Sequence, residues 1–128
     1  MNPRWITLLS VVLYAAALAT PALTSASPSP NETPMFGWQC FLFGPAYFIV
    51  VWPLLCWIPN PWLFLLWLNT LRGRRTGPSG TWGAFGFSIA SVAFLGMVFS
   101  YFPHVGAILW IASMAAGGFA AMENDCLA

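Results

Sequence analysis

The chain has 128 residues, of which 59% are hydrophobic and only 5% are charged. An average soluble domain is about one-quarter charged, so this chain cannot cover an aqueous surface with charged groups. Disorder is excluded too, because disordered segments are poor in apolar residues. The composition therefore indicates an integral membrane protein, and a net charge of +1 gives no basis for a nucleic-acid partner.

The first apolar segment, residues 5–23, has two interpretations. It is a transmembrane helix, or it is a secretory signal peptide in which Arg4 precedes the apolar core. In the second case Thr24 and Ala26 are the small residues before the cleavage site, and cleavage after Ala26 removes one helix. Residues 24–35, rich in serine and proline, then form an external loop in either interpretation.

The second apolar block, residues 36–71, is too long for one straight crossing. As a continuous helix it would measure about 54 Å, against roughly 30 Å of hydrocarbon. Pro59, Asn60 and Pro61 interrupt it. The side chain of Asn60 is suited to cap a new helix whose first residue is Pro61. We therefore expect a helix break at these three residues.

Two arrangements of this block remain open. In the first, residues 36–43 lie at the outer membrane interface and residues 46–71 form one crossing that is broken at the prolines. In the second, residues 38–58 make a full crossing and a re-entrant or interfacial segment follows. Discontinuous helices of this kind expose backbone groups that bind ions or substrates in transporters.

The cations predict the orientation of the chain. Loops rich in lysine and arginine stay in the cytoplasm. Residues 72–81 form a short basic loop, and the only cations of the chain are Arg4, Arg72, Arg74 and Arg75. We expect these topology-determining residues and both chain ends to lie in the cytoplasm, with a bacterial inner membrane as the location.

The last apolar block predicts a helical hairpin, with residues 82–102 and 105–122 on either side of Pro103. Small residues recur at every fourth position of both helices. Such residues let helix backbones approach closely in lipid. We expect the two helices to pack against each other through Ser88, Gly96, Ser100, Ser113, Gly117 and Ala121.

Together these segments predict an all-α integral membrane protein with a single domain, residues 1–128. The expected fold is a four-helix transmembrane bundle, or three helices if the N-terminal segment is a cleaved signal peptide. It has a proline-broken second block and a C-terminal helical hairpin.

No catalytic, cofactor or metal site is predicted. Pumps and proton relays place ionisable groups within their membrane spans. In this chain every acid and every arginine lies outside the predicted spans. His104, the sole histidine, is expected to be a solvated turn residue beside Pro103. An enzyme is therefore not expected.

The order of motifs resembles one group of proteins. Asn60 and Pro61 begin a helix, a basic turn follows at Arg72–Arg75, and a hairpin ends the chain. This layout is similar to that of small uncharacterised bacterial inner-membrane proteins with about four transmembrane helices, over residues 37–122. The resemblance implies a membrane location and carries no known activity.

The sequence thus favours a non-enzymatic accessory or structural subunit of a membrane complex. Its expected partners are the lipid bilayer and a larger membrane-protein complex or further copies of the chain. The alternative is a small oligomeric transporter or channel whose path is lined by the break at Pro59, Asn60 and Pro61.

Overall fold

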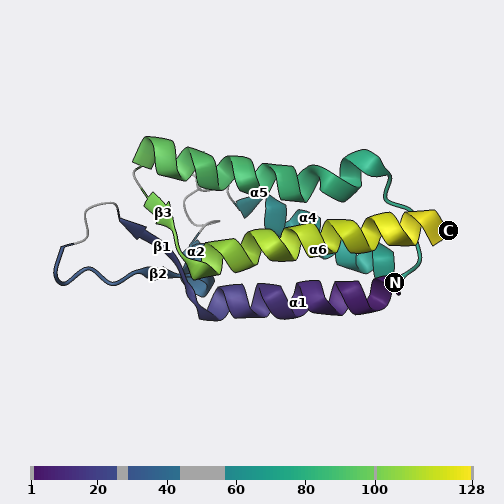
Figure 1. Cartoon of the computed structure of the whole chain (residues 1–128), viewed down its shortest axis with the longest axis horizontal. Helices are drawn as coiled ribbons and strands as arrows, with labels where there is room; N and C mark the ends of the chain where they lie inside the picture. The colour runs from purple at the N-terminus through teal and green to yellow at the C-terminus, as the bar shows by residue number, and fades with distance from the viewer. Residues whose placement is uncertain (1, 26–28, 44–56, 100, 128) are drawn as a thin grey trace.

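The computed structural model describes residues 2–25, 29–43, 57–99 and 101–127. Three long helices run along the longest axis of the molecule, and a shorter helix packs against all three (Figure 1). The helices are α1 (Pro3–Ala19), α2 (Gly37–Phe43), α4 (Pro59–Leu71), α5 (Pro78–Phe99) and α6 (Val105–Leu127). Helix α6 packs along α1 and also contacts α4 and α5, so it is the central element of the bundle.

Polar residues define the two ends of α1. Asn2 caps its first turn, since Oδ1 accepts a hydrogen bond from the backbone N–H of Arg4 at 3.0 Å. At the other end Thr20 adopts an extended conformation, and its hydroxyl donates to the carbonyl of Ala16 at 2.8 Å. Pro21 follows and cannot continue the helix. The helix is therefore limited to 17 residues.

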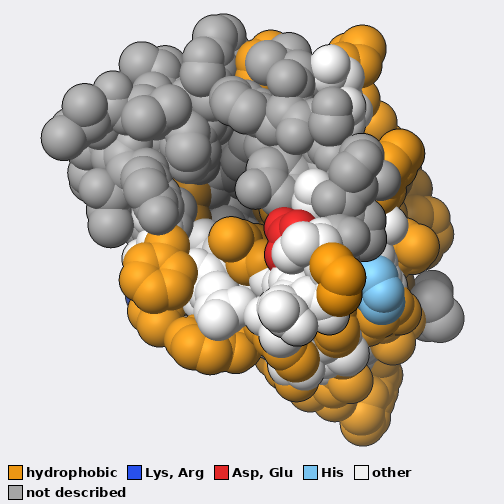
Figure 2. Space-filling model, turned by 90° about the vertical axis from the view of Figure 1, so that its left-hand side faces the viewer, with side chains coloured by type: hydrophobic (Ala, Val, Ile, Leu, Met, Phe, Trp, Pro, Cys, Tyr) orange, Lys and Arg blue, Asp and Glu red, His pale blue; other side chains and the backbone are white. Residues whose placement is uncertain are grey.

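A small antiparallel sheet closes the end of the bundle opposite the two chain termini (Figure 1). Its strands are β1 (Pro21–Ser25), β2 (Met35–Phe36) and β3 (Tyr101–Pro103), in the order β2-β1-β3. Next to β3, the backbone N–H of His104 donates to the carbonyl of Ala22 at 2.8 Å. The histidine is exposed (Figure 2), as expected for a solvated turn residue, and it directly precedes α6.

The turn between α4 and α5 lies at the end that carries both chain termini (Figure 1). Gly73 and Gly77 have positive φ angles of 65° and 80°, a region that glycine enters without the steric penalty of a side chain. The backbone N–H of Arg72 donates to the carbonyl of Leu68 and completes the last turn of α4. The two glycines thus reverse the chain direction within a few residues.

The distribution of side chains is unusual for a soluble protein. Among the residues whose burial the structure describes, most buried apolar ones are alanines and nine buried ones are polar, including Ser10, Ser88 and Ser113 at 0% exposure. Large apolar side chains face outward instead, including Trp5 (68% exposed) and Met97 (79%). Small residues in the interior allow close packing of the helices.

The predicted four-helix transmembrane bundle is wrong. The described residues form five helices and a three-stranded sheet, so the fold is mainly helical without being purely so. Within that part of the chain, α6 is the one helix long and apolar enough to cross a membrane. The 17 residues of α1 and the 13 of α4 fall short of the ~20 that a crossing needs.

The strands explain part of this difference. The residues expected to complete the first crossing and to begin the external loop belong instead to β1. The expected hairpin at Pro103 also contains a strand, because β3 separates α5 from α6. The two arrangements proposed for the second apolar block depend on residues 44–56, which lie outside the described residues.

Candidate functional site: the buried polar cluster around Asn60

The predicted helix break is the place where α4 begins. Ile58 occupies the N-cap position and no side chain caps the helix there. Pro59 is the first residue of α4, a position that tolerates its missing N–H, and Asn60 and Pro61 complete the first turn. The expected capping role of Asn60 is therefore wrong, because this residue already lies inside the helix.

The side chain of Asn60 instead joins three helices. It is 6% exposed, and Oδ1 accepts two hydrogen bonds. One comes from the hydroxyl of Tyr14 on α1 at 3.0 Å, and the other from Nε1 of Trp110 on α6 at 2.8 Å. A buried carbonyl oxygen with two lone pairs is fully used by two such donors. One atom thus connects α1, α4 and α6.

A second polar group joins the same helices. Nε1 of Trp67 on α4 donates to Oγ of Ser10 at 2.8 Å, and the Ser10 hydroxyl donates to the carbonyl of Ser113 at 2.7 Å. Ser10 therefore acts as acceptor and donor at once, between α4 and α6. The ring of Trp67 meets that of Tyr14 edge-on, at 5.6 Å between centroids, so the two polar groups are packed together.

Several of the predicted packing residues lie where helices approach closely, although with different partners. On α6, Ser113 and Gly117 face α1 and α4, since a Cβ on Gly117 would collide with Leu63 Cδ1 and lie 3.2 Å from Ser10 Oγ. The neighbouring Gly118 faces α5, and a Cβ there would lie 2.7 Å from the carbonyl oxygen of Thr81. The contact of α6 with α5 thus uses a glycine that the sequence pattern did not select.

The other predicted packing residues are placed as follows. Ser88 and Ala121 are fully buried, and Gly96 is half-buried. The Ser88 hydroxyl donates to the carbonyl of Phe85 within its own helix at 2.7 Å. Ser100 lies outside the described residues.

The basic turn is attached to the end of α6. The carboxylate of Asp125 accepts hydrogen bonds from the backbone N–H groups of Thr76 and Gly77, both at 2.8 Å. Nδ2 of Asn124 donates to the carbonyl of Arg74 at 2.9 Å. Hydrogen bonds to a charged acceptor are stronger than neutral ones. This carboxylate clamp, which sequence reasoning missed, fixes the turn that presents the arginines.

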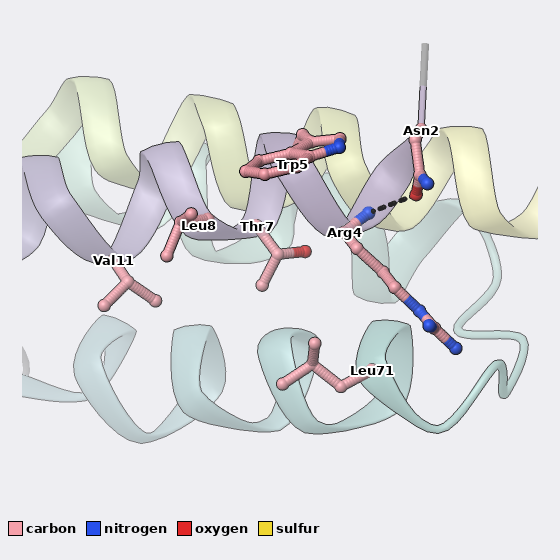
Figure 3. A pocket seen from close by; sticks show the side chains of 7 residues that line it. All are labelled: Asn2, Arg4, Trp5, Thr7, Leu8, Val11 and Leu71. Atoms are coloured by element: carbon pink, nitrogen blue, oxygen red, sulfur yellow. Dashed lines mark hydrogen bonds between the residues drawn. The ribbon is translucent and has the colours of Figure 1, made fainter.

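All four arginines belong to the same end of the bundle. Arg4 lines a pocket with Leu71, the last residue of α4, and Arg72 follows directly (Figure 3). Arg74 and Arg75 stand in the turn held by Asp125. The expected location of the two basic segments in the cytoplasm stays a prediction.

The side chains of the polar cluster are suited to holding helices together. Its side chains are hydroxyl, amide and indole groups, and each hydrogen bond described above is made within the protein. Among the described residues, no three histidine, cysteine or acidic side chains come close enough to hold a metal ion. Comparisons with known protein families, curated proteins and solved structures find no match for this chain.

Proposed function

We propose that the chain is a small membrane protein, inserted through α6, that serves as a non-enzymatic accessory or structural subunit of a larger membrane complex. The observation that carries this proposal is the reversed distribution of side chains. Serine, threonine and alanine make up most of the buried residues described, beside a few large ones such as Leu63, Leu66 and Met114, whereas many other leucine, tryptophan and methionine side chains face outward. Many exposed large apolar side chains are a liability in water and are normal in lipid.

The charges support the same proposal. A bilayer excludes charged side chains from its centre, so they gather at the ends of spanning elements. Here all four arginines lie at one end of the bundle, and Asp125 lies there too. The positive-inside rule places this end in the cytoplasm, which for a bacterial chain means the inner face of the inner membrane.

The hydrogen bonds of Asn60 support a structural role over the transporter alternative. A residue that lines a transport path keeps its polar atoms available for solute. The oxygen of Asn60 is instead taken by Tyr14 and Trp110. We therefore infer that the proline break at the start of α4 positions Asn60 for packing.

The membrane part of the proposal is tested by extraction of membranes with alkaline carbonate. The full-length chain is expected to stay in the membrane pellet, together with a known integral marker protein. Release into the supernatant with a peripheral marker would contradict the proposal.

The subunit part is tested by native mass spectrometry after mild detergent extraction. A stable, stoichiometric complex with another membrane protein is the expected result. A homo-oligomer that leaks solute from liposomes would support the transporter or channel instead. A lone monomer that leaks nothing would contradict both.

A further inference from the structure

The groove between α1 and the last turn of α4 carries an inference about a ligand. This pocket has a volume of about 390 Å³ and opens on the surface at the arginine end of the bundle (Figure 3). Its apolar wall includes Leu8 and Val11 on α1 and Leu71 on α4, each at least 38% exposed. The side chain of Leu71 points back toward α1, so the wall is formed by both helices.

The charge in this groove lies at one end. Arg4 is the one charged residue among its lining residues, and its guanidinium extends from α1 toward the last turn of α4 (Figure 3). From Arg4 to Val11 the groove follows seven residues of helix, or about 10 Å. A cation at the water-facing end and apolar side chains below it form the complement of an anionic amphiphile.

We propose that this groove binds an anionic phospholipid, with the headgroup phosphate on Arg4 and part of an acyl chain against Leu8, Val11 and Leu71. The inference rests on the proposed membrane location, because it requires that the groove faces lipid. Guanidinium groups pair with phosphate oxygens through two parallel hydrogen bonds, which favours arginine at such a position.

The order of groups in the groove favours a lipid over a free anion. Thr7, at the floor of the groove, already donates its hydroxyl to the carbonyl of Pro3 at 2.9 Å. A free phosphate would find Arg4 and the amide of Asn2 at this end of the groove, and a surface cation with so few partners binds weakly. The apolar residues contribute only when the anion carries a hydrocarbon chain.

Neither of the two acids near this end, Glu123 and Asp125, lines the groove. The carboxylate of Asp125 accepts from the backbone N–H groups of Thr76 and Gly77, and Asp125 does not line the groove. An anionic headgroup thus meets a positive end of the molecule. Anionic lipids are attracted to such arginines with a several-fold gain per charge.

The test uses native mass spectrometry of the full-length chain in detergent, with dioleoyl phosphatidylglycerol or dioleoyl phosphatidylcholine added at equal concentration. The unaltered protein is expected to retain phosphatidylglycerol at least about fivefold better than phosphatidylcholine. Arg4→Gln is expected to remove this preference. Arg75→Gln, which changes an arginine of the same end outside the groove, is expected to keep it. Equal losses in the two variants would overturn the proposal, because they would indicate nonspecific attraction.

A second pair of variants tests the acyl-chain contact. Val11→Trp fills the groove, whereas Val12→Trp adds the same bulk to an exposed neighbour outside it. Only Val11→Trp is expected to reduce retained phosphatidylglycerol, by severalfold at unchanged melting temperature. Displacement of the lipid by an equal concentration of glycerol phosphate would overturn the proposal in favour of a free-anion site.

Failure of this inference is distinguishable from failure of the proposed function. Carbonate extraction reports membrane insertion without reference to the groove. A chain that stays in the membrane but binds both lipids equally would overturn the lipid site alone.

Discussion

Oδ1 of Asn60 lies 2.8 Å from Nε1 of Trp110, a residue fifty positions further along the chain. The same oxygen also accepts from the hydroxyl of Tyr14. Two helices are therefore attached to α4 through a single atom in its first turn. Because the donors are an indole and a phenol, which are large and rigid, this contact fixes both the spacing and the rotation of the three helices.

Removal of this acceptor is expected to destabilise the protein. In Asn60→Leu, Tyr14 and Trp110 keep their donors but lose the shared acceptor, at a cost of about 1–3 kcal/mol. Thermal unfolding of the purified chain in detergent measures the effect. Asn69→Leu, the same change at a half-buried position of the same helix, serves as the control. Equal losses of stability in the two variants would show that the hydrogen bonds at Asn60 contribute nothing specific.

Two glycines test the close approach of helices. In Gly118→Ala, the new Cβ would lie 2.7 Å from the backbone oxygen of Thr81, which cannot move without shifting α5. We expect a loss of about 1–3 kcal/mol. A Cβ on Gly86, also helical, meets nothing within 4 Å. Gly86→Ala should therefore be neutral or stabilise by up to about 1 kcal/mol through helix propensity. Chemical denaturation that ranks the two variants in the opposite order would contradict the helix packing.

The carboxylate clamp is testable by proteolysis. Asp125→Ala removes two hydrogen bonds that hold the turn between α4 and α5. Trypsin is expected to cleave after Arg74 or Arg75 severalfold faster in this variant, because cleavage requires local opening of the chain. Glu123→Ala changes an acid in the same helical turn and is expected to leave the rate unaltered. A cleavage rate in Asp125→Ala equal to that of the unaltered chain would contradict the clamp.

The contacts of α1 bear on the signal-peptide interpretation. This helix donates hydrogen bonds from Ser10 and Tyr14 to the rest of the bundle, and a Cβ on Gly37 would collide with the backbone of Ala17. We therefore expect α1 to be retained. N-terminal sequencing of the protein purified from membranes should yield Met1 or Asn2, whereas a start at Ser27 would show cleavage after Ala26.

Features that depend on neighbouring residues were predictable. The proline at position 103 does separate two helices, and a helix does begin within residues 59–61, although at Pro59 instead of the expected Pro61, because both effects act through the local backbone. Both properties follow from steric rules that operate within a few residues.

Features that depend on distant residues were not predictable. The sheet requires that Leu23 pairs with Pro103. A prediction of membrane spans from composition does not consider pairing between distant residues. The pattern of small residues likewise selected Gly117, yet it could not tell that this glycine faces α1 and α4 while Gly118 faces α5. A regular spacing identifies one face of a helix, but it does not identify the helix that packs against this face.

The position of α6 at the centre of the bundle has a consequence for synthesis. Ser10 on α1 and strand β1 find their partners in α6 and β3, which follow much later in the chain. Pairing between segments so far apart in the chain is slow, because the intervening loop must close first. Helix α1 must therefore remain incompletely packed until α6 has been synthesised. Loss of α6 would deprive α1, α4 and α5 of the helix that each of them contacts most.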